Sequence, residues 1–174
     1  MRRRPFPDLP PGARLKRDPA LVPLSRDHHH ALVRSLRLRD AAAGEPGPAA
    51  AAARAFLEHW HGAMLGHFAD EEDVLFPAVE ATHPEAVARL RAEHLEIASL
   101  VVRLEESLGA GPVPRDLLAE LGWLVHDHVR FEERVLFEEV QAGLGPSGLA
   151  DVGRALEEHR AARGLAPGCP TESG

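Results

Sequence analysis

Cysteine is nearly absent from this sequence of 174 residues, since Cys169 is the only one. A single cysteine excludes an intramolecular disulfide, and it argues against a thiolate metal site or an iron–sulfur cluster. We therefore expect the protein to work in a reducing cytoplasm.

Long apolar runs are absent as well. No stretch approaches the roughly 20 apolar residues that span a bilayer, and the basic cluster at residues 2–4 is followed by prolines rather than by the apolar core of a signal peptide. Acidic residues outnumber basic ones by 27 to 20, which gives a formal net charge of -7. Such a charge disfavours nucleic acids and anionic lipids. We expect neither as a partner, and the sequence identifies no protein partner.

Tyrosine is missing and aromatic residues make up only 5% of the chain. The apolar residues recur at spacings of three and four rather than alternating, which is typical of amphipathic helices. The length fits one domain. Short connections favour antiparallel neighbours, so we predict an all-α fold: an up-down-up-down four-helix bundle with a short fifth C-terminal helix.

Prolines and glycines divide the chain into five expected helices. They are expected near residues 23–43, 49–80, 84–108, 115–143 and 146–163. We assign 1–20 to an irregular N-terminal arm, 21–165 to the bundle and 166–174 to a disordered tail. Pro77 falls inside the second helix, so a kink or a lost hydrogen bond is expected between Asp73 and Pro77.

Two segments of the chain resemble each other closely, one beginning at His67 and the other at His128. Each places a histidine four residues before a glutamate, Glu71 in the first copy and Glu132 in the second. Residues four apart differ by only about 40° around a helix, so each pair lies on one face, one turn apart. One helix can therefore offer imidazole and carboxylate together.

A second repeat precedes the first. Asp27-His28 aligns with Glu93-His94 at an offset of 66 residues, so the chain looks internally duplicated. His29 is the alternative to His28 if the register is wrong by one, and His28 is preferred because the repeat aligns it with His94. Four helices then supply six candidate metal ligands, which are His28, His67, Glu71, His94, His128 and Glu132.

Carboxylates in an apolar core are costly unless a positive charge compensates them. Imidazole plus carboxylate suits iron, with manganese or zinc as alternatives. Glu71 and Glu132 could each bridge two ions, which favours a dinuclear centre. A single His-x-x-x-Glu pair is common on solvated helices, and it is the duplication that favours metal binding.

The remaining candidates are expected to lie away from the metal. Glu72 and Glu133 sit about 100° around the helix from their neighbours, so we expect them to hydrogen-bond a ligand or to face solvent. The remaining histidines off the inferred faces are expected at the surface or behind a ligand: His59, His61, His83, His126 and His159.

With these motifs in place, the chain resembles the hemerythrin-like HHE cation-binding family over roughly residues 22–142. The resemblance implies a four-helix bundle around an oxo- or hydroxo-bridged pair of iron ions. It implies bridging roles for Glu71 and Glu132. It also implies terminal ligands at the four repeat histidines, which are His28, His67, His94 and His128.

The chain departs from the oxygen-carrying hemerythrins at two points. Those proteins have two histidines four apart on the third helix, whereas Leu90 and Ala98 flank His94 here. Their fourth helix also has a longer His-to-Asp spacing than the one from His128 to Glu132. One iron then lacks a protein ligand, and Glu93, His29 or an exogenous ligand could take that position.

The expected function is that of a non-heme di-iron protein that binds O2, or a related small ligand such as NO or peroxide, for sensing or for handling iron and oxygen. One alternative is a di-iron redox enzyme that reduces peroxide or NO or oxidises iron. A second is a metal-stabilised structural module. The sequence does not decide whether the protein is an enzyme.

Overall fold

The computed structural model describes residues 16–44 and 47–164, and all the regular secondary structure of its described part is helical, with no strand. The predicted all-α fold is therefore confirmed. Residues 16–21 form a non-helical segment that ends in a turn. The rest of the expected N-terminal arm and the expected C-terminal tail lie outside the described residues, and the domain boundaries stay a prediction.

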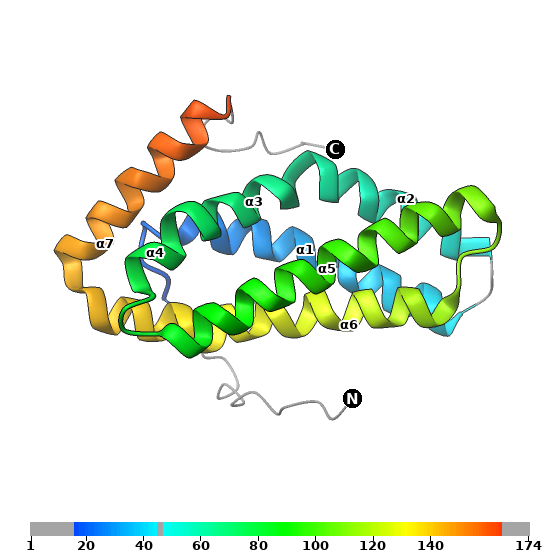
Figure 1. Cartoon of the computed structure of the whole chain (residues 1–174), viewed down its shortest axis with the longest axis horizontal. Coiled ribbons are helices and arrows are strands. Elements are labelled where there is room, and N and C mark those ends of the chain that lie inside the picture. Colours follow the sequence, from blue (N-terminus) through cyan, green and yellow to red (C-terminus); the bar gives the residue numbers. More distant parts are fainter. Residues whose placement is uncertain (1–15, 45–46, 165–174) are drawn as a thin grey trace.

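Four long helical stretches form a bundle, and a further helix turns back beside them (Figure 1). Two of the four stretches are single helices, α1 (Val22–Ala43) and α5 (Pro84–Ala110). The other two each contain π-helical turns. The second stretch consists of α2 (Gly47–His59), η1 (Trp60–Met64), α3 (Leu65–Asp70), η2 (Glu71–Leu75) and α4 (Phe76–Val79). The fourth consists of α6 (Arg115–Phe131), η3 (Glu132–Leu136) and the beginning of α7 (Phe137–Ala162).

Prolines and glycines end the helices much as the sequence predicts. Proline occupies the first turn of α1 and of α5, where its missing N–H costs nothing. Within α7 the backbone of Gly145 takes a positive φ of 64°, which glycine adopts without strain, and Pro146 follows it. The expected fifth helix is therefore the second half of α7, beyond this bend.

Two apolar clusters fill the interior, with a layer of buried polar residues between them. One cluster surrounds Phe56, Trp60 and Leu121, and the other surrounds Phe76 and Phe137. The polar layer consists mainly of histidine and glutamate side chains. None of the described helices is long and apolar enough to cross a membrane.

The π-helical turns η2 and η3 begin at Glu71 and Glu132, the equivalent glutamates of the two repeats. The first lies just before Pro77, where the sequence predicts an irregularity. The second repeat has Glu138 at the position of Pro77 and forms the same turn. Proline is therefore not the cause of the π-helical turn. Such turns are rare and occur often at functional sites.

Candidate metal centre

The six residues predicted as ligands lie together in the middle of the bundle, each with a side chain almost fully buried. They form two overlapping groups, in each of which the potential ligand atoms lie within 4.8 Å of one another. The first group is His28, His67, Glu71 and Glu132, and the second is Glu71, His94, His128 and Glu132. Both glutamates belong to both groups. The structure thus brings the six together, and their role as ligands stays a prediction.

The spacing of four residues works as expected on both repeats. His67 Nε2 lies 3.2 Å from Glu71 Oε1, and His128 Nε2 lies 3.3 Å from Glu132 Oε2. Each histidine is near the end of an α-helix, and each glutamate is the first residue of a π-helical turn. His28 comes from α1 and His94 from α5, so all four helical stretches contribute.

Glu71 presents different oxygens to the two groups. Its Oε1 lies 3.2 Å from His67 Nε2 and 3.5 Å from His28 Nε2, whereas its Oε2 lies 3.3 Å from His94 Nε2. Glu132 Oε2 lies 3.1 Å from His28 Nε2 and also faces His128. A carboxylate that faces imidazoles of both groups has the arrangement required of a bridging ligand.

Several buried atoms of these side chains have no hydrogen-bond partner among the described residues. They are Nε2 of His28, His94 and His128, Nδ1 of His67, and all four carboxylate oxygens of Glu71 and Glu132. Buried polar atoms rarely stay unpaired in folded proteins. The nitrogen–oxygen separations of 3.1–3.5 Å across the centre also suit pairs of ligands that each lie about 2.1 Å from a shared ion. The donor set therefore fits metal ions.

A carboxylate outside the centre faces the other ring nitrogen of every clustered histidine. The Nδ1 to carboxylate distances are 2.7 Å for His28 to Glu133, 2.7 Å for His94 to Glu72, 3.0 Å for His128 to Glu93 and 3.4 Å for His67 to Asp27. Such pairs fix the orientation of a metal-binding imidazole and direct its Nε2 toward the metal. The expectation that Glu72 and Glu133 support ligands agrees with these contacts.

The outer carboxylates follow the internal duplication. In each half of the chain, the acid of the acid–His segment contacts the histidine of the following His-x-x-x-Glu segment. Asp27 contacts His67, and Glu93 contacts His128. Sequence reasoning missed this pairing, although the duplicated acids were visible. The contact between Glu93 and His128 also argues against Glu93 as the additional metal ligand considered from the sequence. Glu93 accepts hydrogen bonds from Arg89 Nε and His128 Nδ1 and is held outside the centre.

Arginines stand behind three of these four carboxylates. Arg17 Nη2 donates to Glu133 Oε2 at 2.7 Å, Arg89 donates to Glu93 at 2.7 Å, and Arg160 donates to Asp27 at 2.6 Å. Arg17 lies in the segment that the sequence assigned to an irregular N-terminal arm. Its contact depends on tertiary packing over more than 100 residues, which no local pattern indicates.

The buried charges shift one another strongly. Burial lowers the pKa of His67, but the Glu71 carboxylate and Asp27 outweigh it and raise that pKa to about 9. Burial likewise opposes protonation of His28, yet the carboxylates of Glu132, Glu133 and Glu71 that face its ring raise its pKa well above 6.5. Burial raises the pKa of Glu71, and the surrounding imidazoles reverse this and hold it well below its ordinary value. In the absence of metal, protons therefore supply the positive charge.

The other histidines lie outside both groups. His29, His30 and His61 are exposed, so the structure places His28 rather than His29 at the centre. His59, which is half-buried, has its pKa lowered to about 4, chiefly because burial disfavours its charged form and neighbouring cations add to the effect. His159 contacts Asp70, one residue before Glu71.

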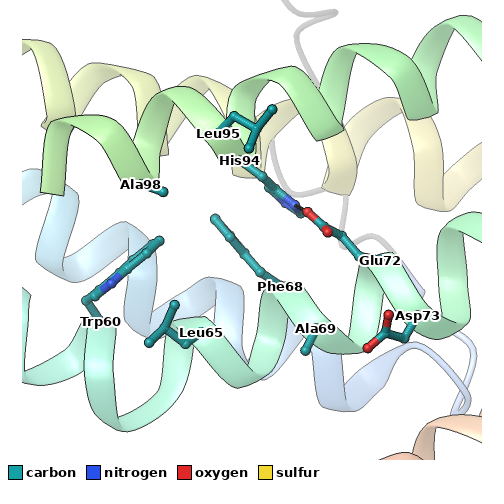
Figure 2. Close-up of a pocket in the computed structure, with 9 residues that line it drawn as sticks. All are labelled: Trp60, Leu65, Phe68, Ala69, Glu72, Asp73, His94, Leu95 and Ala98. Carbon is teal, nitrogen blue, oxygen red and sulfur yellow. Dashed lines mark hydrogen bonds and ion pairs between the residues drawn. The ribbon is translucent and has the colours of Figure 1, made fainter. Parts of the chain in front are cut away.

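A cavity of about 290 Å³ lies between α3 and α5 and reaches the centre at His94 (Figure 2). Its walls are mainly apolar, with Trp60 and Leu65 on one side and Leu95 on the other. The ring of Phe68 stacks on the imidazole of His94 with their centroids 3.6 Å apart. Phe68 therefore packs directly against an imidazole that also lines the cavity.

Comparison with known proteins agrees with this geometry. The family model of the hemerythrin HHE cation binding domain matches residues 21–140, well over half of the chain. No match was found among curated proteins or solved structures. The matched range contains all six clustered residues. The chain therefore belongs to the hemerythrin HHE cation binding domain family.

Proposed function

We propose that the protein is a non-heme di-iron protein of hemerythrin type that binds O2, or a related small ligand such as NO or peroxide, for sensing or for handling iron and oxygen. The observation that supports this most directly is the overlap of the two groups at Glu71 and Glu132. Two groups that share both carboxylates suit a pair of neighbouring ions better than a single one.

In this proposal the chain holds one ion through His28 and His67 and the other through His94 and His128, with the two glutamates shared. Iron, when bound, supplies the affinity for small ligands and the redox chemistry. The protein orients each imidazole through its outer carboxylate and keeps bulk water away by burying every donor. Glu71 and Glu132 offset the positive charge of the ions.

The ligand count favours binding of an exogenous molecule. Each group offers two histidines and two shared carboxylates, whereas iron with nitrogen and oxygen ligands commonly takes six. Open positions therefore remain for a small ligand. The cavity beside His94 is a suitable approach for an uncharged diatomic molecule, because apolar side chains form most of its walls.

The up-down-up-down order of the bundle and a cytoplasmic location are part of the same proposal. The connections between the helical stretches at residues 80–83 and 111–114 are short, which favours antiparallel neighbours. The single cysteine suits a reducing compartment.

The first test is metal analysis of anaerobically purified protein, followed by absorption spectra after exposure to air and then to azide. About two irons per chain, with charge-transfer bands that azide changes, is the expected result. One zinc per chain, or no metal, would contradict the proposal and favour the structural module. Sustained consumption of peroxide or NO with an electron donor would instead identify a redox enzyme.

A further inference from the structure

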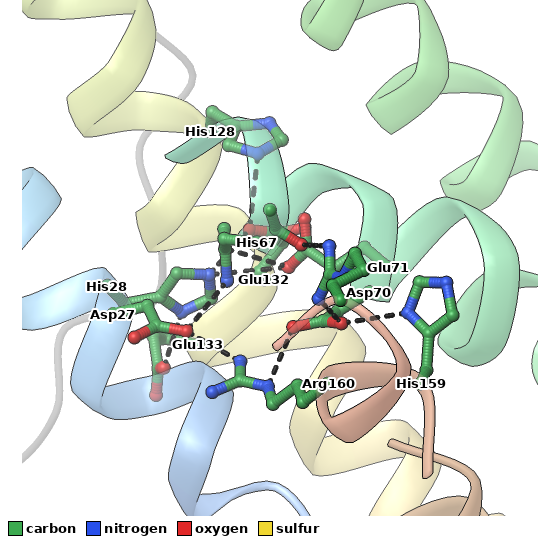
Figure 3. A network of polar contacts seen from close by, with 12 residues as sticks. Asp27, His28, His67, Asp70, Glu71, His128, Glu132, Glu133, His159 and Arg160 are labelled. Atoms are coloured by element: carbon green, nitrogen blue, oxygen red, sulfur yellow. Dashed lines mark hydrogen bonds and ion pairs between the residues drawn. The ribbon is translucent and has the colours of Figure 1, made fainter. Parts of the chain in front are cut away.

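The second half of α7 contacts the bundle through a group of charged residues that lies next to the candidate ligands (Figure 3). Asp70 is at the middle of this group and is only 1% exposed. Arg160 Nε lies 2.7 Å from its Oδ2, His159 Nδ1 lies 3.0 Å from its Oδ1, and Arg163 contacts the same Oδ1. A buried carboxylate with three basic partners ties α7 to the residue that precedes Glu71.

Arg160 contacts two carboxylates from two different helices. Besides Asp70 on α3, its Nη2 donates to Asp27 Oδ2 on α1 at 2.6 Å. The same Asp27 oxygen lies 3.4 Å from Nδ1 of His67. A guanidinium presents its donors in a rigid planar fork, so one arginine can hold both carboxylates in fixed directions. Arg160 thereby restricts the oxygen that faces His67.

Within the part of the chain that the structure describes, no comparable contact joins α7 to the group formed by His94 and His128. Glu93, which faces His128, is held by Arg89 from its own helix. Glu72, which faces His94, is 39% exposed. Among the described residues, the support of these two histidines therefore comes from α5 and the neighbouring η2 turn.

From this difference we propose that Arg160 is a positioning residue for one of the two metal sites. Through Asp27 it holds His67 in the orientation that the site formed with His28 requires, so the second half of α7 belongs functionally to that site. The inference rests on the proposed function for the presence of the metal. The orientation of His67 does not depend on metal and can be tested separately.

The test compares Arg160→Gln with Arg154→Gln in the full-length chain. Arg154 lies on the same half of α7, is 64% exposed and pairs only locally with Asp151, so it is a matched control. Arg160→Lys is the second variant. It keeps a positive charge beside the buried Asp70 and should stay folded, but an ammonium cannot hold two carboxylates in a planar fork.

The first readout is the histidine ring signals of 15N-labelled, metal-free protein. Arg160→Gln should move the ring signals of His67 and leave those of His128 unchanged. Arg160→Lys should shift them less, and Arg154→Gln should shift neither. Unchanged His67 signals in Arg160→Gln would overturn the proposal, whether or not the protein binds metal.

The second readout is Fe(II) affinity in chains that keep one group of histidines. In a His94→Ala, His128→Ala background, Arg160→Gln should weaken binding by about tenfold, the lower end of the range for residues that support a ligand. In a His28→Ala, His67→Ala background it should change little. Equal losses in both backgrounds would show that Arg160 stabilises only the fold and would overturn the proposal. Absence of metal from the wild-type chain would instead refute the proposed function, and the ring signals would still decide the role of Arg160.

Discussion

The carboxylates of Glu71 and Glu132 face the imidazole rings of all four clustered histidines, so the charge of this layer depends on whether those rings carry protons or metal ions. Without metal, the raised pKa values of His28 and His67 keep protons on the rings and balance the carboxylates. A metal ion needs the same nitrogen lone pairs and replaces those protons. Protons and metal ions are therefore competitors for one set of atoms.

Removal of a clustered side chain should lower the metal content. We expect His67→Ala to lose one donor of the first group and Glu132→Ala to weaken both groups, with metal well below two ions per chain in each variant. His59→Ala should retain the wild-type content, since His59 belongs to neither group. Metal per chain is measured by mass spectrometry after anaerobic loading and desalting. Equal retention in all three variants would contradict the ligand assignment.

Metal affinity should rise with pH. The pKa of His67 is raised to about 9, so below that pH its proton must leave before the ring can bind metal. As the pH falls, protons compete more strongly with metal for the ring nitrogen, and the apparent metal affinity decreases. Calorimetric titration at pH 7 in two buffers with different heats of ionisation measures the protons released. We expect release into the buffer, and proton uptake or no exchange would contradict the predicted competition.

At the scale of single elements, the π-helical turns at Glu71 and Glu132 are the main departure from regular geometry. Each turn is one residue wider than an α-helical turn, and its first residue is the glutamate whose carboxylate lies in the centre. Hydrophobic spacing predicted helices over both stretches, and Pro77 predicted a kink or a lost hydrogen bond in the first, but neither signal indicated a π-helical turn. The sequence therefore predicted the helices but not their local widening.

The contact between α1 and α6 depends on a glycine. A Cβ atom at Gly122 would lie 2.9 Å from the carbonyl oxygen of Ser35 and 2.8 Å from the side chain of Arg39. We expect Gly122→Ala to destabilise the protein by about 1–3 kcal/mol, as overpacking does. Gly109 in α5 has open space around it, so Gly109→Ala should be neutral or stabilising by up to about 1 kcal/mol. Urea unfolding measures both, and equal free energies of unfolding would contradict the predicted clash.

The helix ends and the pairing of His67 with Glu71 were predictable because both depend on local rules, and the internal duplication predicted that the other four side chains would join them. Prolines and glycines end helices, and a spacing of four puts His67 and Glu71 on one face. The supporting residues were harder to foresee. Arg17 and Arg160 reach their carboxylates across more than 100 residues, and such contacts follow from the packing of α7 and the N-terminal segment rather than from a periodic pattern.

At the scale of the whole molecule, a charged layer separates two apolar clusters. Both clusters contain residues from all four helical stretches, and metal ions in the layer between them would cross-link the same four stretches. Metal binding and folding are then coupled, because the unfolded chain has no preformed site.

Removal of metal should therefore lower the melting temperature. At a free metal concentration 100 times the dissociation constant, one site stabilises the folded state by about 2.7 kcal/mol. For a chain of this length, that corresponds to roughly 5–10 °C. Thermal unfolding followed by circular dichroism, with and without a chelator, measures the shift. Glu132→Ala should show little shift, and a wild-type protein that is indifferent to chelation would argue against the coupling.

The position of Trp60 has an optical consequence. The chain has two tryptophans and no tyrosine. The Trp60 indole is 5.4 Å from Phe68, which in turn stacks on His94, whereas Trp123 lies beside Arg39 and His126. A coloured metal centre would quench tryptophan emission by energy transfer. The intrinsic fluorescence of the protein would thus report how far the centre is loaded, without any attached dye.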